Sequence, residues 1–564
     1  MSSCPSSEDV EFYALKTAAV QFYRNSKVPQ EIERALNELF YHQPEDRLGF
    51  LANYFSGLST PVRISKVRGR EVFDVRGQLV VEAQVFCIVR NKEKRMSSAS
   101  ILSHFPLTRT FHDLNAQCDE RLEHVTTAVQ WINGALNDML KGRSPCDQTG
   151  ADSVLSKFFL PYSTETIELT LWPKEESVSH CESEMVPSTP VPTKEKKCTD
   201  RKKKCNSVEK PILPPEPPKP APAGSMAIGS LSLALAKAGA EVQERPLYKY
   251  IASLKNPEAE TQFHIPVPLI TILSCGKNSH GKVSLFEEVI LVPKPGQQAK
   301  QAITTSVELQ REVLRIINNS TKSGAAHPIH LEGGLLVLSF ERLEHPLDLI
   351  NEASANLGLT LGVDVYLALN CAAFDLMDYS KGKYEISTGT LKTPDELVEF
   401  YRGLISKFPA VVALIDPFRR EDPEQWEKLS HATGHTCVLL SEVSHDLQSP
   451  LLHGAAGYVL RYMNEMTISD LLTISVQHHG AVIMGSASCE PCGDDCLADL
   501  AVGLGLDYIK MGGLSSAEKM TKYNRLISIE EELAQEGILA SRESHPPPLC
   551  TEAPPEESAS PDTD

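Results

Sequence analysis

Apolar residues follow two different spacings along the chain, and each spacing predicts one kind of element. Residues 62–90 carry two strand-like runs, VRISKV and EVFDVRGQLVVEAQVFCIV, with a turn at residues 76–78. Residues 10–60 and 122–160 instead place their apolar side chains at helical spacing. The first part of the chain is therefore predicted to contain both helices and strands.

From Ile265 onward, short apolar runs alternate with amphipathic segments. The candidate strands are LTLGVDVYL, AVVALI, HTCVLL, AGYVLRY, GAVIMGS and DYIKMG, and segments such as PDELVEFYRGLISKF between them are predicted helices. Strands that alternate with helices over about 280 residues predict a parallel α/β barrel. An open doubly wound sheet is the competing fold, although no glycine-rich nucleotide loop follows any of these strands.

Two segments have compositions that do not favour a packed core. Residues 173–224 contain KEKKCTDRKKKC and then PILPPEPPKPAPAG, a solvated charge run followed by a stretch that favours extended polyproline conformations. We interpret the basic run as a linker, with nuclear import as the alternative, and PPEPPKP as a spacer, with docking to an SH3-type groove as the alternative. Residues 544–564 are Pro-rich and acidic and are predicted to be disordered.

Composition and charge limit the classes of function. The chain has 564 residues, of which 41% are apolar and 23% charged, as expected for a protein with two or three folded domains. A formal net charge of −19 argues against nucleic-acid binding, and no apolar run approaches the ~20 residues of a membrane span. The N-terminus does not resemble a secretory signal, and 14 scattered cysteines fit a reducing compartment, so a cytoplasmic protein is expected.

Several segments, taken in order, resemble the enolase family. SKVRGREVFDVRGQLVVEAQV is similar to the opening hairpin of the family, and IGSLSLALAKAGA with RPLYKYIASL resembles the last helices of its N-terminal domain. GKYEIS, DPF, ADLAVGL and IKMGGLSSAEKMTKYNRLISIEEEL follow in family order, so the resemblance covers roughly residues 62–540. It implies an N-terminal α+β domain on an α/β barrel. It also implies a dimeric phosphopyruvate hydratase, the glycolytic lyase that uses two Mg2+ ions to convert 2-phosphoglycerate to phosphoenolpyruvate.

The predicted organisation is a helical module, an α+β domain in two pieces, the insertion between these pieces, a barrel and an acidic tail. The helical module covers residues 1–60, and the α+β domain covers residues 61–172 and 225–260, with the insertion at residues 173–224 between its two pieces. The barrel covers residues 261–543 and the acidic tail residues 544–564.

Two glutamates match acidic residues of the enolase active site. Dehydration needs a carboxylic acid that assists departure of the hydroxyl group. Glu332 in HLEGGL matches the family's Glu-Gly-Gly, where the glutamate is the general acid, and Glu288 in LFEEVILVP matches its second acidic position. The alternative for both is a surface glutamate. His280 in KNSHGK lies near the family's Ser-His-Ala-Gly substrate loop, with an exposed loop histidine as the alternative.

Of the two positions where the family has active-site lysines, one is changed in this sequence. Arg461 in YVLRY stands where the family has its catalytic lysine, and Lys510 in YIKMGG matches the second active-site lysine, which binds substrate. A guanidinium cannot plausibly act as a neutral base, although it can hold a carboxylate or phosphate. Lys510 is the alternative base if its pKa is lowered.

The resemblance also implies three carboxylates at three strand ends that hold magnesium. Asp364 in LGVDV matches the first, whereas Ile415 in VVALIDPF stands at the second and Ser441 in VLLSEV at the third. Asp416 and Glu442 directly follow the latter two positions. Because neighbouring residues of a strand face opposite sides, both are expected to point away from the ion.

Two loops of the implied site have changed residues. The lid becomes SSASIL, in which Ser100 matches a serine that contacts metal, and the phosphate loop becomes SASCEPCG, in which Ala487 and Ser488 replace a histidine and an arginine. Three cysteines in and after the phosphate loop predict reduced thiols, with zinc binding as the alternative: Cys489, Cys492 and Cys496.

The N-terminal module carries a different signal. Residues 28–59 are predicted to form two helices around a start signal at residues 44–46. QPEDRLGFLANYF resembles the docking modules of cAMP-dependent kinase regulatory subunits and the Dpy-30 family, which dimerise as four-helix bundles and hold an amphipathic anchoring helix. The resemblance implies docking through Leu48, Leu51 and Phe55, and such modules are frequent in cilia and flagella. A helical hairpin packed on the enolase-like body is the alternative.

Two functions are compatible with these residues. The first is an enolase-like scaffold with little or no catalysis, dimeric through its enolase-like body and tethered through residues 28–59. The second is an active Mg2+-dependent enolase with altered ligands, which uses Glu332 as acid and Lys510 near the substrate. The replacements at Ile415, Ser441 and Arg461 favour the scaffold.

Overall fold

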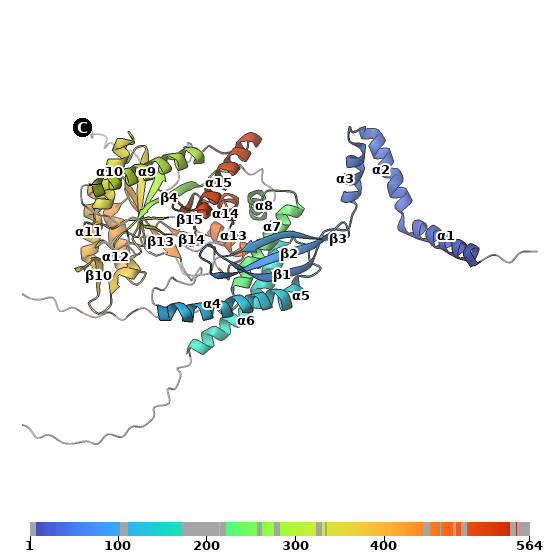
Figure 1. Cartoon of the computed structure of the whole chain (residues 1–564), viewed down its shortest axis with the longest axis horizontal. Helices are drawn as coiled ribbons and strands as arrows, with labels where there is room; N and C mark the ends of the chain where they lie inside the picture. Colours follow the sequence, from blue (N-terminus) through green and yellow to red (C-terminus); the bar gives the residue numbers. More distant parts are fainter. Residues whose placement is uncertain are drawn as a thin grey trace, which may run out of the picture.

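A computed structural model gives the fold for most of the chain. It describes residues 7–101, 111–171, 222–256, 262–275, 282–322, 330–332, 335–434, 436–443, 452–462, 464–477, 481–486 and 493–541, together with Ile212, Pro214 and Leu549. Figure 1 shows three parts along the molecule: a barrel, an α+β domain against it, and a helical arm that extends away from both.

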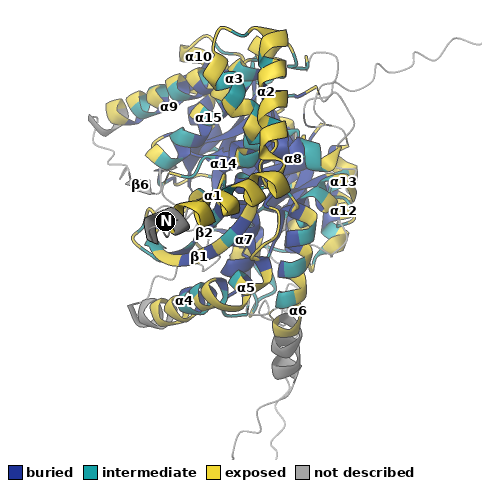
Figure 2. Cartoon of the chain, turned by 90° about the vertical axis from the view of Figure 1, so that its right-hand side faces the viewer, coloured by how far each residue is buried: buried dark blue, intermediate teal, exposed yellow. Residues whose placement is uncertain are grey.

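The helical arm consists of α1 (Ser7–Ser26), α2 (Val28–His42) and α3 (Arg47–Gly57). The predicted helices at residues 28–59 are confirmed, and α3 begins where the Asp46 side chain accepts a hydrogen bond from the Gly49 N–H at 2.8 Å. The rings of His42 and Phe50 lie 5.5 Å apart where α2 meets α3. Figure 2 shows that most of the arm is exposed.

The α+β domain is built on an antiparallel sheet. Its strands are β1 (Arg63–Phe73), β2 (Leu79–Val89) and β3 (Lys92–Ser100), in the order β1-β2-β3, and the first two are the predicted strands at residues 62–90. The sheet packs on α7 (Met226–Val242), most of whose residues are buried. The helices of the domain are α4 (Phe111–Trp131), the π-helical η1 (Ile132–Leu136), α5 (Asn137–Leu140), α6 (Gln148–Leu171), α7 (Met226–Val242) and α8 (Leu247–Lys255).

Eight strands close the barrel, because the first strand in the sheet order, β16, also pairs with the eighth, β4, and β7 and β6 continue the sheet beyond β4. The strands are β4 (Val267–Ser274), β5 (Glu288–Pro293), β8 (Val365–Asn370), β12 (Val411–Ile415), β13 (Val438–Val443), β14 (Gly457–Arg461), β15 (Ala481–Gly485) and β16 (Tyr508–Gly512). The predicted α/β barrel is confirmed with one difference. The second strand, β5, runs antiparallel to both β4 and β8, so the barrel is mixed.

Helices cover the outside of the barrel. A capping box between Thr393 and Glu396 starts α11, and Gly537, with a φ of 71°, ends α15. The helices are α9 (Ala299–Lys322), α10 (His345–Asn356), α11 (Pro394–Lys407), α12 (Pro423–Thr433), α13 (Ile468–Gln477), α14 (Cys496–Gly503) and α15 (Ala517–Glu536). The smaller elements are β6 (His330–Glu332), β7 (Leu335–Val337), the 3-10 helix η2 (Ala373–Leu376), β9 (Met377–Asp378), β10 (Lys383–Ser387) and β11 (Thr390–Lys392).

Two residues of the predicted unstructured segments are attached to the barrel. Ile212, in the Pro-rich part of the insertion, donates its N–H to Tyr379 O at 2.9 Å. Leu549, in the tail, is 5% exposed and packs with the interior side chains of the barrel, and its N–H donates to Tyr508 Oη at 2.9 Å. The helices among the described residues include none that is long and apolar enough to cross a membrane.

Candidate active site

The carboxyl-terminal ends of the parallel barrel strands form a mouth in which alternate residues face the interior. Below the mouth, side chains such as Leu269, Ile290 and Val459 pack in an apolar interior cluster. Because side chains alternate between the two faces of a strand, the residue two positions closer to the mouth than an interior residue also faces the interior. These residues are Thr271, Glu288, Asn370, Glu442, Arg461 and Lys510.

Lys510 and Glu288 form a buried ion pair in the mouth, with 2.5 Å between Nζ and Oε2. The same carboxylate accepts hydrogen bonds from Asn370 Nδ2 at 2.9 Å and from Thr271 Oγ1 at 3.0 Å. Burial alone would raise the pKa of Glu288, but the Lys510 ammonium and these donors outweigh burial and lower the pKa to about 2. Glu288 is therefore an anion at neutral pH whose oxygens are engaged by protein donors.

The structure corrects the first metal position. Asp364 immediately precedes β8, and its Oδ2 accepts a hydrogen bond from Thr360 N at 2.9 Å within a turn. Asn370 ends the strand opposite Glu288, so Asp364 lies at the amino-terminal end of β8. Six residues of strand span about 20 Å. Asp364 is therefore too far from the mouth to be a ligand there, and an amide stands at the strand end.

The other two predicted metal positions carry no carboxylate either. Ile415 is fully buried in the interior cluster beside Asn370, and Ser441 is buried on β13. Within the described residues, no group of three or more His, Cys, Asp or Glu side chains is arranged to hold a metal ion. Mg2+ takes octahedral oxygen ligands that usually include carboxylates. The described residues of the mouth do not fit this ion.

Glu442 points into the mouth, contrary to the expectation that it faces away. Its Oε1 lies 2.5 Å from an Arg461 guanidinium nitrogen. The reason is the register of β13, in which Glu442 shares its face with the interior residue Leu440. Arg461, at the position of the family's catalytic lysine, is thus held by a carboxylate.

Asp416 adopts an unusual backbone conformation after β12. Its φ is 47°, a left-handed conformation that aspartate tolerates, and its Oδ1 accepts a hydrogen bond from Glu442 N at 2.9 Å. Burial and the nearby negative charge of Glu442 raise the pKa of Asp416 to about 7. Its carboxyl group is therefore close to half-protonated at neutral pH and faces the backbone of β13.

Ser100 lies where the α+β domain meets the barrel. It ends β3 and lines a cavity of about 40 Å³ together with Ser486 and Lys522. Ser486 follows β15, and its N–H donates to Lys510 O at 2.8 Å. The structure thus brings Ser100 to the same side of the barrel as Lys510, and its contact with a metal stays a prediction.

Several predicted positions cannot be placed in full. Glu332 ends β6, which pairs with β7 at the edge of β4, but its side chain is outside the described residues. His280, Ala487, Ser488, Cys489 and Cys492 also lie outside the described residues. Cys496 is buried at the start of α14, and burial together with Asp494 raises its pKa well above the ordinary value. A thiol in this environment disfavours the thiolate that zinc requires.

The predicted docking residues lie on the exposed arm. Leu48 is 79% exposed and Phe55 is 38% exposed, while Leu51 between them is half-buried. Further apolar side chains are exposed on α2, namely Ile32, Leu36, Phe40 and Tyr41.

Sequence reasoning missed three contributors to the mouth: Thr271, Asn370 and the pairing of Glu442 with Arg461. Asn370 was missed because the predicted strand LTLGVDVYL ends three residues too early. The signal that could have found it is the apolar run VYLAL directly before Asn370.

Comparison with known proteins agrees with this architecture. The family description "Enolase, C-terminal TIM barrel domain" matches residues 262–547. The chain is 45% identical over 556 residues to Enolase 4 of Danio rerio, covering 96% of this chain and 95% of that protein. It is 41% identical over 551 residues to Enolase 4 of Xenopus laevis, covering 96% of each protein. It is 39% identical over 577 residues to Enolase 4 of Homo sapiens, covering 95% of this chain and 91% of that protein. The matched barrel and the near full-length similarity show that the chain belongs to the enolase family.

Proposed function

We propose that this enolase-family protein does not carry out magnesium-dependent dehydration of 2-phosphoglycerate and instead acts as a scaffold. The observation that carries the proposal is the hydrogen bond from Asn370 Nδ2 to Glu288 at the mouth of the barrel. This contact orients the donor end of an amide toward a carboxylate at a strand end where the family chemistry needs a metal ligand.

Charge balance in the mouth supports the same proposal. Among the described side chains of the mouth, both inward-facing glutamates have a cationic partner, Lys510 for Glu288 and Arg461 for Glu442. Asp416 adds at most a partial negative charge near neutral pH, because its pKa is about 7. Little net negative charge is left to offset the cost of removing water from a divalent ion.

Neither basic residue described in the mouth is suited to abstract a proton. Arg461 carries a guanidinium, which stays protonated in proteins. Lys510 would have to lose its proton while it lies 2.5 Å from the Glu288 carboxylate. That loss would leave a buried carboxylate without its counter-charge.

The helical arm supports the scaffold role. Apolar side chains on both α2 and α3 are exposed, although a hairpin that was complete by itself would bury them. We propose that residues 28–59 dimerise and hold amphipathic anchoring helices, while the enolase-like body forms a second dimer contact. The proposed setting is a cytoplasmic assembly, either glycolytic or in a cilium or flagellum.

Magnesium calorimetry on the purified full chain tests the proposal. We expect no saturable binding of Mg2+, with or without 2-phosphoglycerate, under conditions in which a magnesium-dependent enolase binds the ion. Saturable binding by this chain would favour the alternative, an active enolase with altered ligands. In that case Lys510→Ala should abolish turnover.

A further inference from the structure

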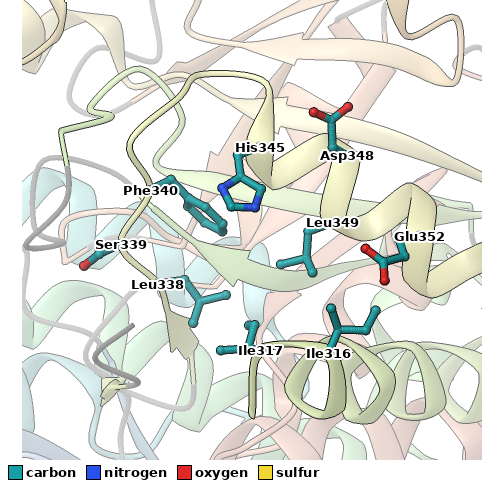
Figure 3. Close-up of a pocket in the computed structure, with 9 residues that line it drawn as sticks. All are labelled: Ile316, Ile317, Leu338, Ser339, Phe340, His345, Asp348, Leu349 and Glu352. Carbon is teal, nitrogen blue, oxygen red and sulfur yellow. The ribbon is translucent and has the colours of Figure 1, made fainter. Parts of the chain in front are cut away.

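A cavity on the outer wall of the barrel lies between α9 and α10 (Figure 3). One of its lining residues, Leu338, donates its N–H to the carbonyl of Ser274 at the carboxyl end of β4. Its volume is about 220 Å³. The floor is apolar and almost entirely buried: Ile317 and Leu349 are each 5% exposed, Phe340 is 3% exposed and Leu338 is 1% exposed. Such a floor favours the aliphatic or aromatic part of a ligand.

The rim of this cavity is acidic on the α10 side. His345, Asp348 and Glu352 follow one another at spacings of three and four residues, so they share one face of the helix. All three are exposed, and Figure 3 shows both carboxylates above Ile316 and Ile317 in that view. The cavity therefore combines an apolar interior with a negatively charged edge.

Two of the described cations near the rim are already paired with other carboxylates. Arg315, which has an electrostatic interaction with Glu352, already pairs with Glu312 at 2.5 Å. Lys282, on the other side of the Phe340 segment, pairs with Glu341 at 2.5 Å. The rim thus favours a cationic group and disfavours phosphates and carboxylates.

Size narrows the class of ligand further. A cavity of about 150 Å³ takes one benzene molecule, and pockets for drug-sized ligands begin at about 300 Å³. The space between α9 and α10, at about 220 Å³, lies between these limits. It fits a short alkyl chain with a charged end and is too small for a nucleotide or a flavin.

We propose that this cavity binds a lysine side chain of a partner polypeptide. The aliphatic stem packs on Leu338, Phe340 and Leu349, and the ammonium group contacts Asp348 and Glu352. A long side chain with a charged end satisfies both environments at once, because it buries its stem and keeps its charge at the edge. The neighbouring residues of the polypeptide add the contacts that a free amine would lack. This inference does not depend on the loss of catalysis at the mouth.

Ligand-observed nuclear magnetic resonance on the full chain tests the proposal. The probe is acetyl-Ala-Lys-Ala-amide, and the matched peptide replaces lysine with norleucine, which keeps the stem but lacks the charge. We expect saturable binding of the lysine peptide and binding at least about tenfold weaker for the norleucine peptide. Binding of n-butylammonium as tight as that of the peptide would overturn the assignment to a polypeptide.

Two variants locate the binding. Asp348→Asn/Glu352→Gln should weaken binding of the lysine peptide by about tenfold or more. The control Glu399→Gln/Glu421→Gln removes two exposed carboxylates elsewhere on the barrel and should leave binding unchanged. Equal binding by both variants, or no binding by the unmodified chain, contradicts the proposal. Thermal unfolding of both variants checks that neither has lost its fold.

Discussion

Lys510 and Glu288 lie in contact at the mouth of the barrel, with 2.5 Å between the ammonium nitrogen and a carboxylate oxygen, and both side chains are buried. The pair is held from the other side by Asn370 and Thr271, which donate to the same carboxylate. The resemblance assigns Lys510 to substrate binding and Glu288 to the family's second acidic position, and in the structure these two residues bind each other. This contact joins four side chains of the mouth, those of Thr271, Glu288, Asn370 and Lys510, in one polar network.

The network predicts a large stability effect when one partner is changed. Glu288→Gln removes the counter-charge of Lys510 while keeping the shape of the side chain. We expect the free energy of unfolding to fall by about 3–5 kcal/mol, because a buried charge is left unpaired. Chemical denaturation at neutral pH measures this difference.

The double variant Glu288→Gln/Lys510→Met is the control for that prediction. It removes both charges, so most of the lost stability should return. A double variant as unstable as the single one contradicts a direct interaction between the two charges.

Replacing Asp416 should raise the stability of the protein, and this gain should depend on pH. Its pKa is raised from 3.8 to about 7, so the folded state is penalised as pH rises from about 4 to about 7 and the carboxyl group ionises. Asp416→Asn keeps an acceptor for Glu442 N and removes that penalty. We expect this variant to be more stable than the unmodified chain at pH 8, by up to about 4 kcal/mol, and no more stable near pH 4. Unfolding curves across this pH range measure the difference, and an offset that does not vary with pH refutes the assignment.

From the packing of Leu549 we expect that part of the tail stabilises the barrel. Its side chain is 5% exposed among interior residues near Tyr508, at the end of the barrel opposite the mouth. Leu549→Ala should lower the free energy of unfolding by about 2 kcal/mol or more. Leu357→Ala, at a side chain that is 38% exposed, is the control and should have little effect. Equal stability of the two variants contradicts the packing of Leu549.

The arm predicts an interaction that can be removed without harm to the barrel. Leu51→Glu/Phe55→Glu places two charges on α3, at one half-buried and one 38% exposed position. We expect loss of binding to amphipathic anchoring helices, measured by co-precipitation, with unchanged unfolding of the barrel. Val476→Glu on α13, where the valine is 60% exposed, is the matched control. Unchanged partners would mean that the arm has only a structural role.

The architecture could be predicted from the sequence because local signals agree with it. Apolar runs such as VVALI and GAVIMG coincide with β12 and β15, and Thr393 with Glu396 marks the start of α11. The antiparallel direction of β5 could not be predicted, because the composition of an apolar run such as the one after Glu288 does not indicate which way the strand runs in the sheet. The packing of Leu549 also depends on the closed barrel, which supplies its contacts only after folding.

The mouth was predicted less well than the fold, for two physical reasons. The family match placed the first metal position at Asp364, which precedes β8, whereas Asn370 ends this strand. The predicted strand stopped at Leu367, three residues short of Asn370. The facing of Glu442 depends on the register of β13 beyond Ser441, and the short apolar run HTCVLL does not fix it. Which side chains reach the mouth therefore depends on where each strand ends, and tertiary packing decides these boundaries.

The conversion of 2-phosphoglycerate by the purified full chain decides whether this protein is a magnesium-dependent enolase. The measurement is formation of phosphoenolpyruvate, followed by its ultraviolet absorbance, with and without Mg2+. We expect no magnesium-dependent product above the protein-free control. Magnesium-dependent turnover near the ~10 s⁻¹ that is typical of enzymes would contradict it.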